Sequence, residues 1–233
     1  INTTIISKVL LCNNYIKMKL SIITITLNSA KTIRDTLNSV LSQSNRNFEH
    51  IIVDGGSRDE TLSILKKYPY KNKKIFIKKN FGIYKSINFG ISKAKGEYIM
   101  ILNSDDIFYS NNTLSEIYKI IINDANKNDI FLGNVVYFKG FNYRNIKRFY
   151  SSKSFKLWQM KFGLMPPHPS SIIKKEIYQK HGKYKEDFEI AGDFEIFLRF
   201  LFIKKLKFKI LKNIFIKMRT GGVSGKNFLS YWI

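Results

Sequence analysis

The chain has 233 residues, of which 44% are hydrophobic, so it is long and apolar enough for one domain with a full core and is not a disordered chain. Its 40 Lys and Arg outnumber 17 Asp and Glu, and the net charge of +23 fits binding to nucleic acid, to an anionic membrane or to phosphorylated substrates. A plainer reading is an AT-rich coding bias that leaves much of this charge on solvated faces.

The first convincing element begins at Met18, and residues 1–17 are expected to form an N-terminal tail or an upstream extension. Residues 5–12 are apolar but short, and the polar stretch after them is a poor signal-peptide cleavage site. The alternative is a weak membrane-contacting segment. Cys12 is the chain's single cysteine, which excludes a disulfide framework, and no run of about 18 apolar residues predicts a transmembrane helix.

From residue 20 onward, strand-like runs alternate with segments of helical spacing. Residues 20–27 (LSIITITL) are β-branched and apolar throughout, which is typical of a strand buried on both faces. This alternation predicts an α/β fold with a parallel, doubly wound sheet, in which ligands bind beyond the carboxyl ends of the strands. Further strands are predicted at 48–53, 74–77, 98–102 and 130–138, with helices at 33–44, from 59, at 83–91 and at 114–122.

After residue 140 the alternation stops, which divides the chain into regions 18–140 and 141–233. Segment 200–219 of the second region mixes Lys with Phe, Ile and Leu. It predicts either a basic, amphipathic membrane-surface patch or a core helix and strand with solvated lysines. The elements predicted in this region are a strand at 171–173, a helix from 175, a strongly apolar helix at 193–203 and a strand or hairpin at 206–218.

Three polar clusters follow predicted strands, at residues 26–28, 54–57 and 103–106. In the second, DGGS, the two glycines permit positive φ and close approach of a ligand to the backbone. The patterns G-x-G-x-x-G and G-K-[ST] are both absent, which argues against NAD binding and against ATP hydrolysis of the P-loop kind. Asp54 then either accepts hydrogen bonds from a base or ribose, or caps the next helix.

The third cluster, NSDD, places two carboxylates side by side at a strand end. Adjacent carboxylates repel each other, and a divalent cation with oxygen ligands removes that repulsion. Mg²⁺ or Mn²⁺ held by one or two carboxylates plus substrate phosphates is a common arrangement. The sequence therefore favours a metal site at Asp105 and Asp106, with a turn and helix N-cap as the alternative.

In their order along the chain, these segments resemble the family 2 glycosyltransferases, and among them the bacterial enzymes of O-antigen, capsule and other envelope polysaccharide assembly. The resemblance is densest at 19–106 and continues through HPSS (168–171) and AGDFEIFLR (191–199). It implies the GT-A fold, a Rossmann-like, mostly parallel sheet flanked by helices. The densest segments read SIITITLNSAKTI, SVLSQS, EHIIVDGGSRDET and FGIYKSINFGISKAKGEYIMILNSDD.

The resemblance assigns the donor residues one by one, in a nucleotide-sugar-binding half that spans the first region. Thr26 and Asn28 match the nucleotide-binding loop after the first strand. Asp54 matches the carboxylate that contacts uracil or ribose. Asp105 and Asp106 match the D-x-D region, which holds Mn²⁺ or Mg²⁺ and the diphosphate.

The second region is expected to be the acceptor side, which also carries the basic C-terminal segment. Asp193 matches the catalytic base, although an Asp at a helix start is also a common cap. His168 and Glu195 match positions near the acceptor or the diphosphate. On sequence alone, His168 between prolines is more often structural than catalytic.

The activity that the resemblance implies is a metal-dependent, inverting transfer of a hexosyl or N-acetylhexosaminyl group. The donor is expected to be a UDP-sugar, and the acceptor a hydroxyl of a glycan or lipid-linked molecule in bacterial envelope polysaccharide synthesis, for example of lipopolysaccharide. The protein is expected to be cytoplasmic, with peripheral contact with the anionic inner face of the cytoplasmic membrane. No nucleic-acid recognition motif occurs, so nucleic acid is not an expected partner.

Four positions depart from the family pattern around the donor site. Leu27 stands where a tyrosine can stack on the base, and Asn103 replaces the first Asp of D-x-D. Asn80 and Lys85 replace acidic positions in the segment that often reads D-x-G-I-Y-D-A-M-N. These changes support an alternative function, a catalytically weak or inactive nucleotide- or polyanion-binding protein with the same fold.

Overall fold

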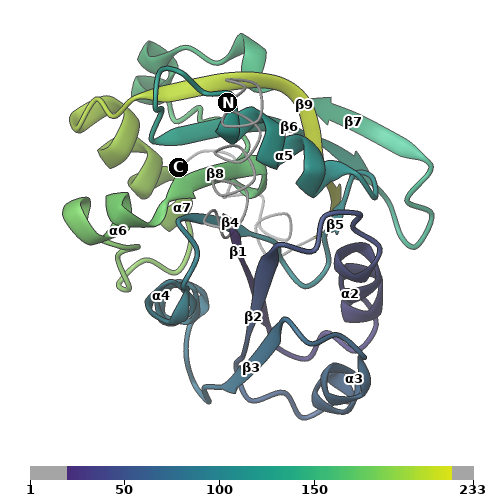
Figure 1. The fold of residues 1–233 in the computed structure, drawn as a ribbon. Coiled ribbons are helices and arrows are strands. Elements are labelled where there is room, and N and C mark those ends of the chain that lie inside the picture. Colours follow the sequence, from purple (N-terminus) through teal and green to yellow (C-terminus); the bar gives the residue numbers. More distant parts are fainter. Residues whose placement is uncertain (1–19, 222–233) are drawn as a thin grey trace, which may run out of the picture.

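The computed structural model describes residues 20–221, so the expectations for residues 1–17 lie outside the described residues. Within that range a nine-stranded sheet is flanked by helices (Figure 1). The strand order is β3-β2-β1-β4-β8-β6-β9-β5, and β7 pairs with β6 off this path. The strands are β1 (Leu20–Thr26), β2 (Phe48–Asp54), β3 (Lys73–Ile77), β4 (Tyr98–Ile101), β5 (Ile107–Phe108), β6 (Ile130–Phe138), β7 (Ile146–Tyr150), β8 (Ser171–Lys174) and β9 (Phe208–Arg219).

The helices follow the predicted positions in the first region and are shorter in the second. Among residues 20–221, none has both the length and the apolar character needed to cross a membrane. The α-helices are α2 (Ile33–Leu41), α3 (Thr61–Lys67), α4 (Ile83–Lys93), α5 (Thr113–Ile122), α6 (Lys175–His181) and α7 (Gly192–Phe197). Three 3₁₀ segments, η1 (Ser152–Ser154), η2 (Leu157–Phe162) and η3 (His168–Ser170), and a π-helical segment, η4 (Leu198–Ile203), complete the set.

The sheet is mostly parallel, as the sequence predicts. Strands β1, β2, β3 and β4 run parallel to one another. Strand β8 is antiparallel to both β4 and β6, so β6 and its parallel partner β9 run in the same direction as β4. Only β5, β7 and β8 of the described strands oppose that direction. The carboxyl ends of six strands therefore lie at one edge of the sheet.

The core lies on both faces of the sheet because β1 carries buried apolar side chains on both of its faces. Ile22 packs on one face with Leu114 of α5, and Ile23 packs on the other with Ile91 of α4. A Cβ added to Gly90 of α4 would lie 2.6 Å from the Ile23 side chain, so this glycine permits the close approach of helix and strand. The apolar run in the sequence thus indicates a strand that helices cover on both sides.

The second region does not form a separate sheet, since β8 and β9 lie within the same sheet as the first region. The segment predicted as a strand or hairpin at 206–218 is one twelve-residue strand, β9. The apolar helix predicted at 193–203 is α7 followed directly by η4. Phe200 and Phe215 are buried, which fits the core interpretation of segment 200–219, whereas Ile203 is exposed at the end of η4.

Candidate active site

The polar clusters at the ends of β1, β2 and β4 meet at the carboxyl edge of the sheet. Thr26 pairs in register with Asp54, and the Leu102 N–H donates to the Ile23 carbonyl at 2.9 Å. Parallel strands bring together the residues that follow each of them, although these lie far apart in sequence. The edge therefore gathers the residues that the sequence assigns to the donor.

The Asp54 carboxylate is buried and organises its own loop. One oxygen accepts the N–H groups of Gly56 and Ser57 at 2.9 and 2.8 Å, and the other accepts the Ser57 hydroxyl at 2.6 Å. Asp54 does not cap α3, which begins seven residues later. Gly56 has φ +95°, and a Cβ there would meet the Lys79 side chain at 2.9 Å. A carboxylate has about four acceptor positions, so Asp54 keeps capacity for a ligand hydroxyl or N–H.

The loop after β1 is tied to the loop after β2. Asn28 adopts φ 51°, a left-handed conformation that Asn tolerates, and its side-chain oxygen accepts the Arg58 N–H at 2.9 Å. Its own N–H donates to the Ser57 hydroxyl at 2.8 Å. The Thr26 hydroxyl is buried and has no hydrogen-bond partner among the described residues, and Leu27 is 56% exposed. An unpaired buried hydroxyl beside an exposed apolar side chain fits a surface that a ligand completes.

The carboxylates of the NSDD loop differ in environment. Asp106 is buried, and its oxygens accept the Arg219 N–H at 3.1 Å and the Asn103 amide at 3.2 Å. Asp105 is less buried, and its own backbone N–H is its hydrogen-bond partner. Burial raises the pKa of both carboxyls, and at Asp106 the neighbouring charge of Asp105 adds to the effect. Asp105 is therefore the carboxylate with capacity for a cation, and Asp106 anchors the loop.

The anchoring of Asp106 explains the departure at Asn103. The Asn103 amide donates to Asp106, which a carboxylate at this position would not do. An aspartate there would instead place a third negative charge beside two carboxyls whose pKa is already raised. In residues 20–221, no group of three His, Cys, Asp or Glu side chains is arranged to hold a metal. A cation at Asp105 would thus need oxygen ligands from the diphosphate, as Mg²⁺ and Mn²⁺ commonly have.

Arg219, at the end of β9, holds the NSDD loop in place, and sequence reasoning missed it. Its guanidinium donates to the Asp35 carboxylate at 2.8 Å, to the Asp105 carbonyl at 3.3 Å and to the Gly140 carbonyl. It also lies 4.9 Å from the centre of the Phe141 ring. The available signal was its position at the end of a strand, the same signal that identified Asp54.

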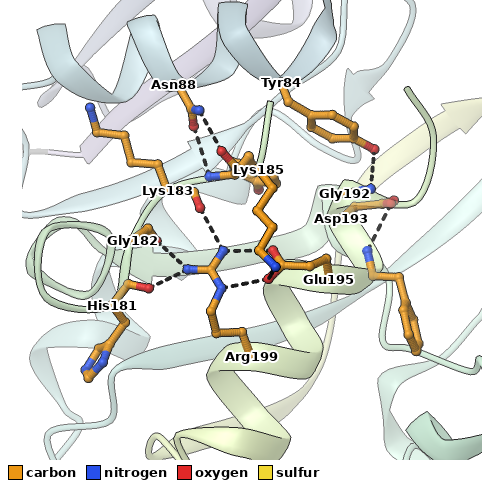
Figure 2. A network of polar contacts seen from close by, with 12 residues as sticks. Tyr84, Asn88, His181, Gly182, Lys183, Lys185, Gly192, Asp193, Glu195 and Arg199 are labelled. Carbon is orange, nitrogen blue, oxygen red and sulfur yellow. Dashed lines mark hydrogen bonds and ion pairs between the residues drawn. The ribbon is translucent and has the colours of Figure 1, made fainter. Parts of the chain in front are cut away.

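Asp193 lies in the first turn of α7, and its oxygen accepts the Phe194 N–H at 3.0 Å (Figure 2). The preceding Ala191 has φ 68°, and the Gly192 N–H donates to the Tyr84 hydroxyl at 2.8 Å. A Cβ on Gly192 would lie 2.6 Å from the Tyr84 ring, so only glycine fits here. Burial raises the pKa of Tyr84 to about 12, with a further contribution from the Asp193 charge. Tyr84 thus keeps its proton, and it holds the backbone of Gly192, the residue before Asp193.

His168 belongs to the same buried cluster. Its Nε2 lies 2.5 Å from the Tyr184 hydroxyl, and the Tyr184 ring stacks on Tyr84 with centroids 5.6 Å apart. Burial lowers the pKa of His168, and the Asp193 charge acts in the opposite direction. The structure therefore brings His168 and Asp193 together, with His168 held as a buried neutral imidazole.

Glu195 lies two residues after Asp193 in α7 and faces Arg199 and Lys185 instead of the cluster. Arg199 pairs with it at 2.8 Å and Lys185 at 3.5 Å, while Arg199 also donates to the carbonyls of Gly182 and Lys183 (Figure 2). Burial alone would raise the pKa of Glu195, but these two cations hold it below its usual range. Through Arg199 and Lys185, Glu195 thus stabilises the segment that carries Tyr184.

Helix α4 supports this cluster through a second residue, Asn88, one helical turn after Tyr84. The Asn88 amide donates to the Tyr184 carbonyl at 2.8 Å, and its oxygen accepts the Tyr184 N–H at 3.0 Å. Sequence reasoning quoted the segment FGIYKSINFG but assigned no role to either residue. Their helical spacing of four, which places both on one face, was the signal that they act together.

The mostly parallel sheet with helices on its faces has the GT-A fold, and the carboxylates described above lie at one edge of it. The chain resembles the crystal structure of S. aureus TarS 1-349 in complex with UDP-GlcNAc, with a TM-score of 0.68 and 23% sequence identity. The similarity covers 88% of this chain and 59% of that one.

The profile of the family Glycosyl transferase family 2 matches residues 21–204, and the chain belongs to this family. It is 28% identical over 182 residues to a PGL/p-HBAD biosynthesis glycosyltransferase of Mycobacterium bovis, covering 77% of this chain and 68% of the relative. It is 27% identical over 210 residues to the uncharacterized glycosyltransferase RT0329 of Rickettsia typhi, covering 86% of this chain. The chain spans 63% of the length of that second relative.

Proposed function

We propose that the protein is an inverting glycosyltransferase that moves a sugar from a UDP-sugar to an acceptor hydroxyl. The observation that carries the proposal is that Asp54 ends β2 and Asp105 follows β4, the two strands that flank β1, at one edge of the sheet, while Tyr84 binds Gly192, next to Asp193. The TarS complex with UDP-GlcNAc supports a uridine nucleotide and an N-acetylhexosaminyl group as the first donor to test.

In the proposed donor site, Asp54, Thr26 and Asn28 bind the nucleoside, and Asp105 faces the diphosphate. The oxygen ligands available here fit Mn²⁺ or Mg²⁺, because Asp105 offers a carboxylate whose negative charge is poorly solvated. Its raised pKa reflects that poor solvation. When bound, the cation neutralises the charge of the departing diphosphate. Asp106 positions Asp105 through its contacts with Asn103 and Arg219.

In the proposed reaction, the acceptor oxygen attacks the anomeric carbon as the bond to the diphosphate breaks. Asp193 takes the proton of the attacking hydroxyl, and the nucleoside diphosphate leaves with the bonding electron pair. One displacement inverts the anomeric configuration. Tyr84 and the Gly192 backbone hold Asp193 at the reacting atoms, and His168 and Tyr184 form the wall behind it.

The acceptor is proposed to be a glycan or lipid-linked molecule of bacterial envelope polysaccharide synthesis, and peripheral contact with an anionic membrane is part of the proposal. Support for this contact comes from η2 and η4, which pack together where Lys161 lies 6.0 Å from the Phe202 ring. Trp158 and Phe162 are 55% and 74% exposed there. Exposed aromatic rings among lysines are typical of a membrane-surface patch.

The alternative, a nucleotide- or polyanion-binding protein without turnover, rests on Asn80 and Lys85. Asn80 adopts φ 59°, so an amide that tolerates the left-handed region serves the turn before α4. Lys85 is exposed, with its ammonium 4.8 Å from the centre of the Phe81 ring. Donor binding without transfer under any condition would favour this alternative.

Thermal unfolding with UDP-sugars and Mn²⁺ tests the donor proposal. We expect UDP-GlcNAc plus Mn²⁺ to raise the Tm of the parent protein and Asp105→Ala to remove the Mn²⁺-dependent part of that rise, because a ligand stabilises the folded state to which it binds. Glu176→Ala, which removes an exposed carboxylate of α6, is the control and should keep the rise. No Tm shift of the parent with any of a panel of nucleotide sugars would refute the donor proposal.

A further inference from the structure

The turn between β6 and β7 lies at the same edge of the sheet as the donor site. Strand β6 runs in the same direction as β4, so residues 139–145 follow its carboxyl end. Arg219 joins this turn to the NSDD loop, since it donates to both the Gly140 and the Asp105 carbonyls. The turn is therefore adjacent to the loop that would hold the diphosphate.

Aromatic rings and cations share the surface of this turn. Phe141 is 64% exposed and Tyr143 is 43% exposed. Arg144 and Lys147 are exposed beside them. No Asp or Glu occurs in the sequence from 130 to 175 or from 196 to 221, so neither β6, β7 nor β9 supplies a neutralising carboxylate. We call Tyr109, Phe141, Tyr143, Arg144, Lys147 and Lys217 the hairpin surface.

Two cations of the hairpin surface, Arg144 and Lys217, lie near each other, and within residues 20–221 neither of them forms a salt bridge. The Lys217 ammonium lies 5.2 Å from the centre of the Tyr109 ring and 5.7 Å from that of Tyr143. Burial lowers the pKa of Lys217, and the nearby Arg144 charge lowers it further. Like charges held together in this way repel each other, and an anion bound between them would relieve the repulsion.

We infer that the hairpin surface binds the acceptor, and that the acceptor is a glycan that carries negative charges such as phosphodiester or carboxylate groups. The inference rests on the proposed function, because it names the substrate class of the same site. Cations contact the anionic groups, and the exposed rings of Phe141 and Tyr143 contact the sugar faces. The alternative is a solvated hairpin without a binding role, whose positive charge reflects the general excess of lysine in the chain.

Binding of a defined anionic glycan tests the inference directly. The probe is polygalacturonate, compared with neutral dextran of similar length and with vesicles of phosphatidylcholine and phosphatidylglycerol. The variant is Arg144→Glu with Lys147→Glu, two exposed residues whose replacement spares the core. Its control is Lys66→Glu with Lys67→Glu, the same charge change on α3, at the far end of the molecule from β7 (Figure 1).

We expect the parent to bind polygalacturonate and not dextran, and the hairpin variant to lose about tenfold or more in affinity. The α3 variant should lose less than about threefold, as expected from net charge alone. Tyr143→Ala, which keeps all cations, should also weaken binding. Equal losses in the hairpin and α3 variants, or a hairpin variant that loses vesicle binding and keeps glycan binding, would overturn the inference.

The Tm shift with UDP-GlcNAc and Mn²⁺, measured on the same variants, separates this inference from the proposed function. We expect the hairpin variant to keep that shift, because neither substituted residue contacts Asp54 or Asp105. A parent without the shift would refute the donor proposal, whereas a parent with the shift and no preference for the charged glycan would refute only the acceptor inference.

Discussion

The donor loops and the Asp193 cluster are built from contacts of very different sequence range. Asp54 bonds to Gly56 and Ser57, two and three positions away. Gly192 bonds to Tyr84 across 108 positions, and Asn88 reaches Tyr184 across 96. The donor loops are therefore shaped locally at the ends of strands, whereas the proposed base is positioned only when α4 and α7 pack together.

The largest effect is expected from a substitution that removes the proposed base of the Asp193 cluster and keeps its shape. Asp193→Asn keeps the shape of the side chain but removes the proton acceptor, so we expect transfer to fall by about 10²–10⁴-fold. Sugar transfer in single-turnover assays measures the change. The Tm shift with UDP-GlcNAc and Mn²⁺ should persist, because Asp193 lies outside the donor loops. Equal loss of transfer and donor binding would remove Asp193 as the base.

The next largest effect is expected from a glycine-to-alanine substitution, made once in each of the two regions. Gly192→Ala places a Cβ 2.6 Å from Tyr84, and Gly90→Ala places one 2.6 Å from Ile23. Both should lower the free energy of unfolding by about 1–3 kcal/mol, as overpacking does. Only Gly192→Ala should also reduce transfer, by about a hundredfold, because it displaces Asp193. Urea unfolding and transfer assays below both Tm values test this; matching activity losses would contradict it.

The donor half carries a buried histidine whose effect is on stability alone. His50 lies between Thr24, at 2.8 Å, and Tyr70, and burial lowers its pKa to about 3, with the Lys73 charge adding to the effect. The unfolded chain binds the proton below about pH 6.5, so stability is full above that pH and is lost as the pH falls towards 3.

Urea unfolding at pH 7 and pH 4.5 tests the role of His50. The parent should lose on the order of 3 kcal/mol more than His50→Gln between these values, because glutamine does not titrate. Donor-induced Tm shifts at pH 7 should stay in place, because His50 lies inside the sheet and not at its carboxyl edge. A variant that keeps the parent's full dependence on pH would show that another group is responsible.

The smallest change removes one buried hydroxyl from α4, beside the Asp193 cluster, or one from α5, away from it. Tyr84→Phe loses the bond to Gly192, and Tyr118→Phe loses an equally buried bond from the Leu20 N–H at 3.2 Å. Each should reduce the free energy of unfolding by about 1 kcal/mol. Tyr84→Phe should also lower kcat by about tenfold and shift its pH profile, since Tyr84 holds the backbone beside Asp193 and interacts electrostatically with its charge. An unchanged pH profile would make Tyr84 purely structural.

Much of the fold was predictable because β1, β2 and β4 each contain a run of buried apolar residues and are each followed by a polar cluster. The missed strands have physical reasons. Strand β5 has only two residues, and β7 is exposed and charged, so neither shows an apolar run. Strand β9 was predicted as a strand or hairpin at 206–218, and the alternative of a basic surface patch stayed open because its lysines mask an alternation in which Leu211 and Phe215 are buried.

Within the proposed site, the sequence predicted roles for Asp54, Asp105 and Asp193 but not for the residues that hold them. Arg219 lies 113 positions from Asp106, and no local pattern connects the two. The sequence also could not predict that Asp105 and Asp106 have different environments. Two adjacent carboxylates are equivalent in the sequence, and only the folded structure buries Asp106 against Arg219 and Asn103. Glu195 was expected near substrate, and its ion pairs with Arg199 and Lys185 turn it towards the segment that carries Tyr184.

The sequence by itself determined the alternating α/β architecture, the edge at which the polar clusters gather and the family, since each depends on local hydrophobic pattern and ordered motifs. Tertiary structure alone decided which carboxylate keeps capacity for a cation, why Asn103 stands beside Asp106, and how Tyr84 reaches Asp193. The reason is physical: burial and hydrogen bonding between elements about a hundred positions apart depend on packing, which is not encoded in any short stretch of chain.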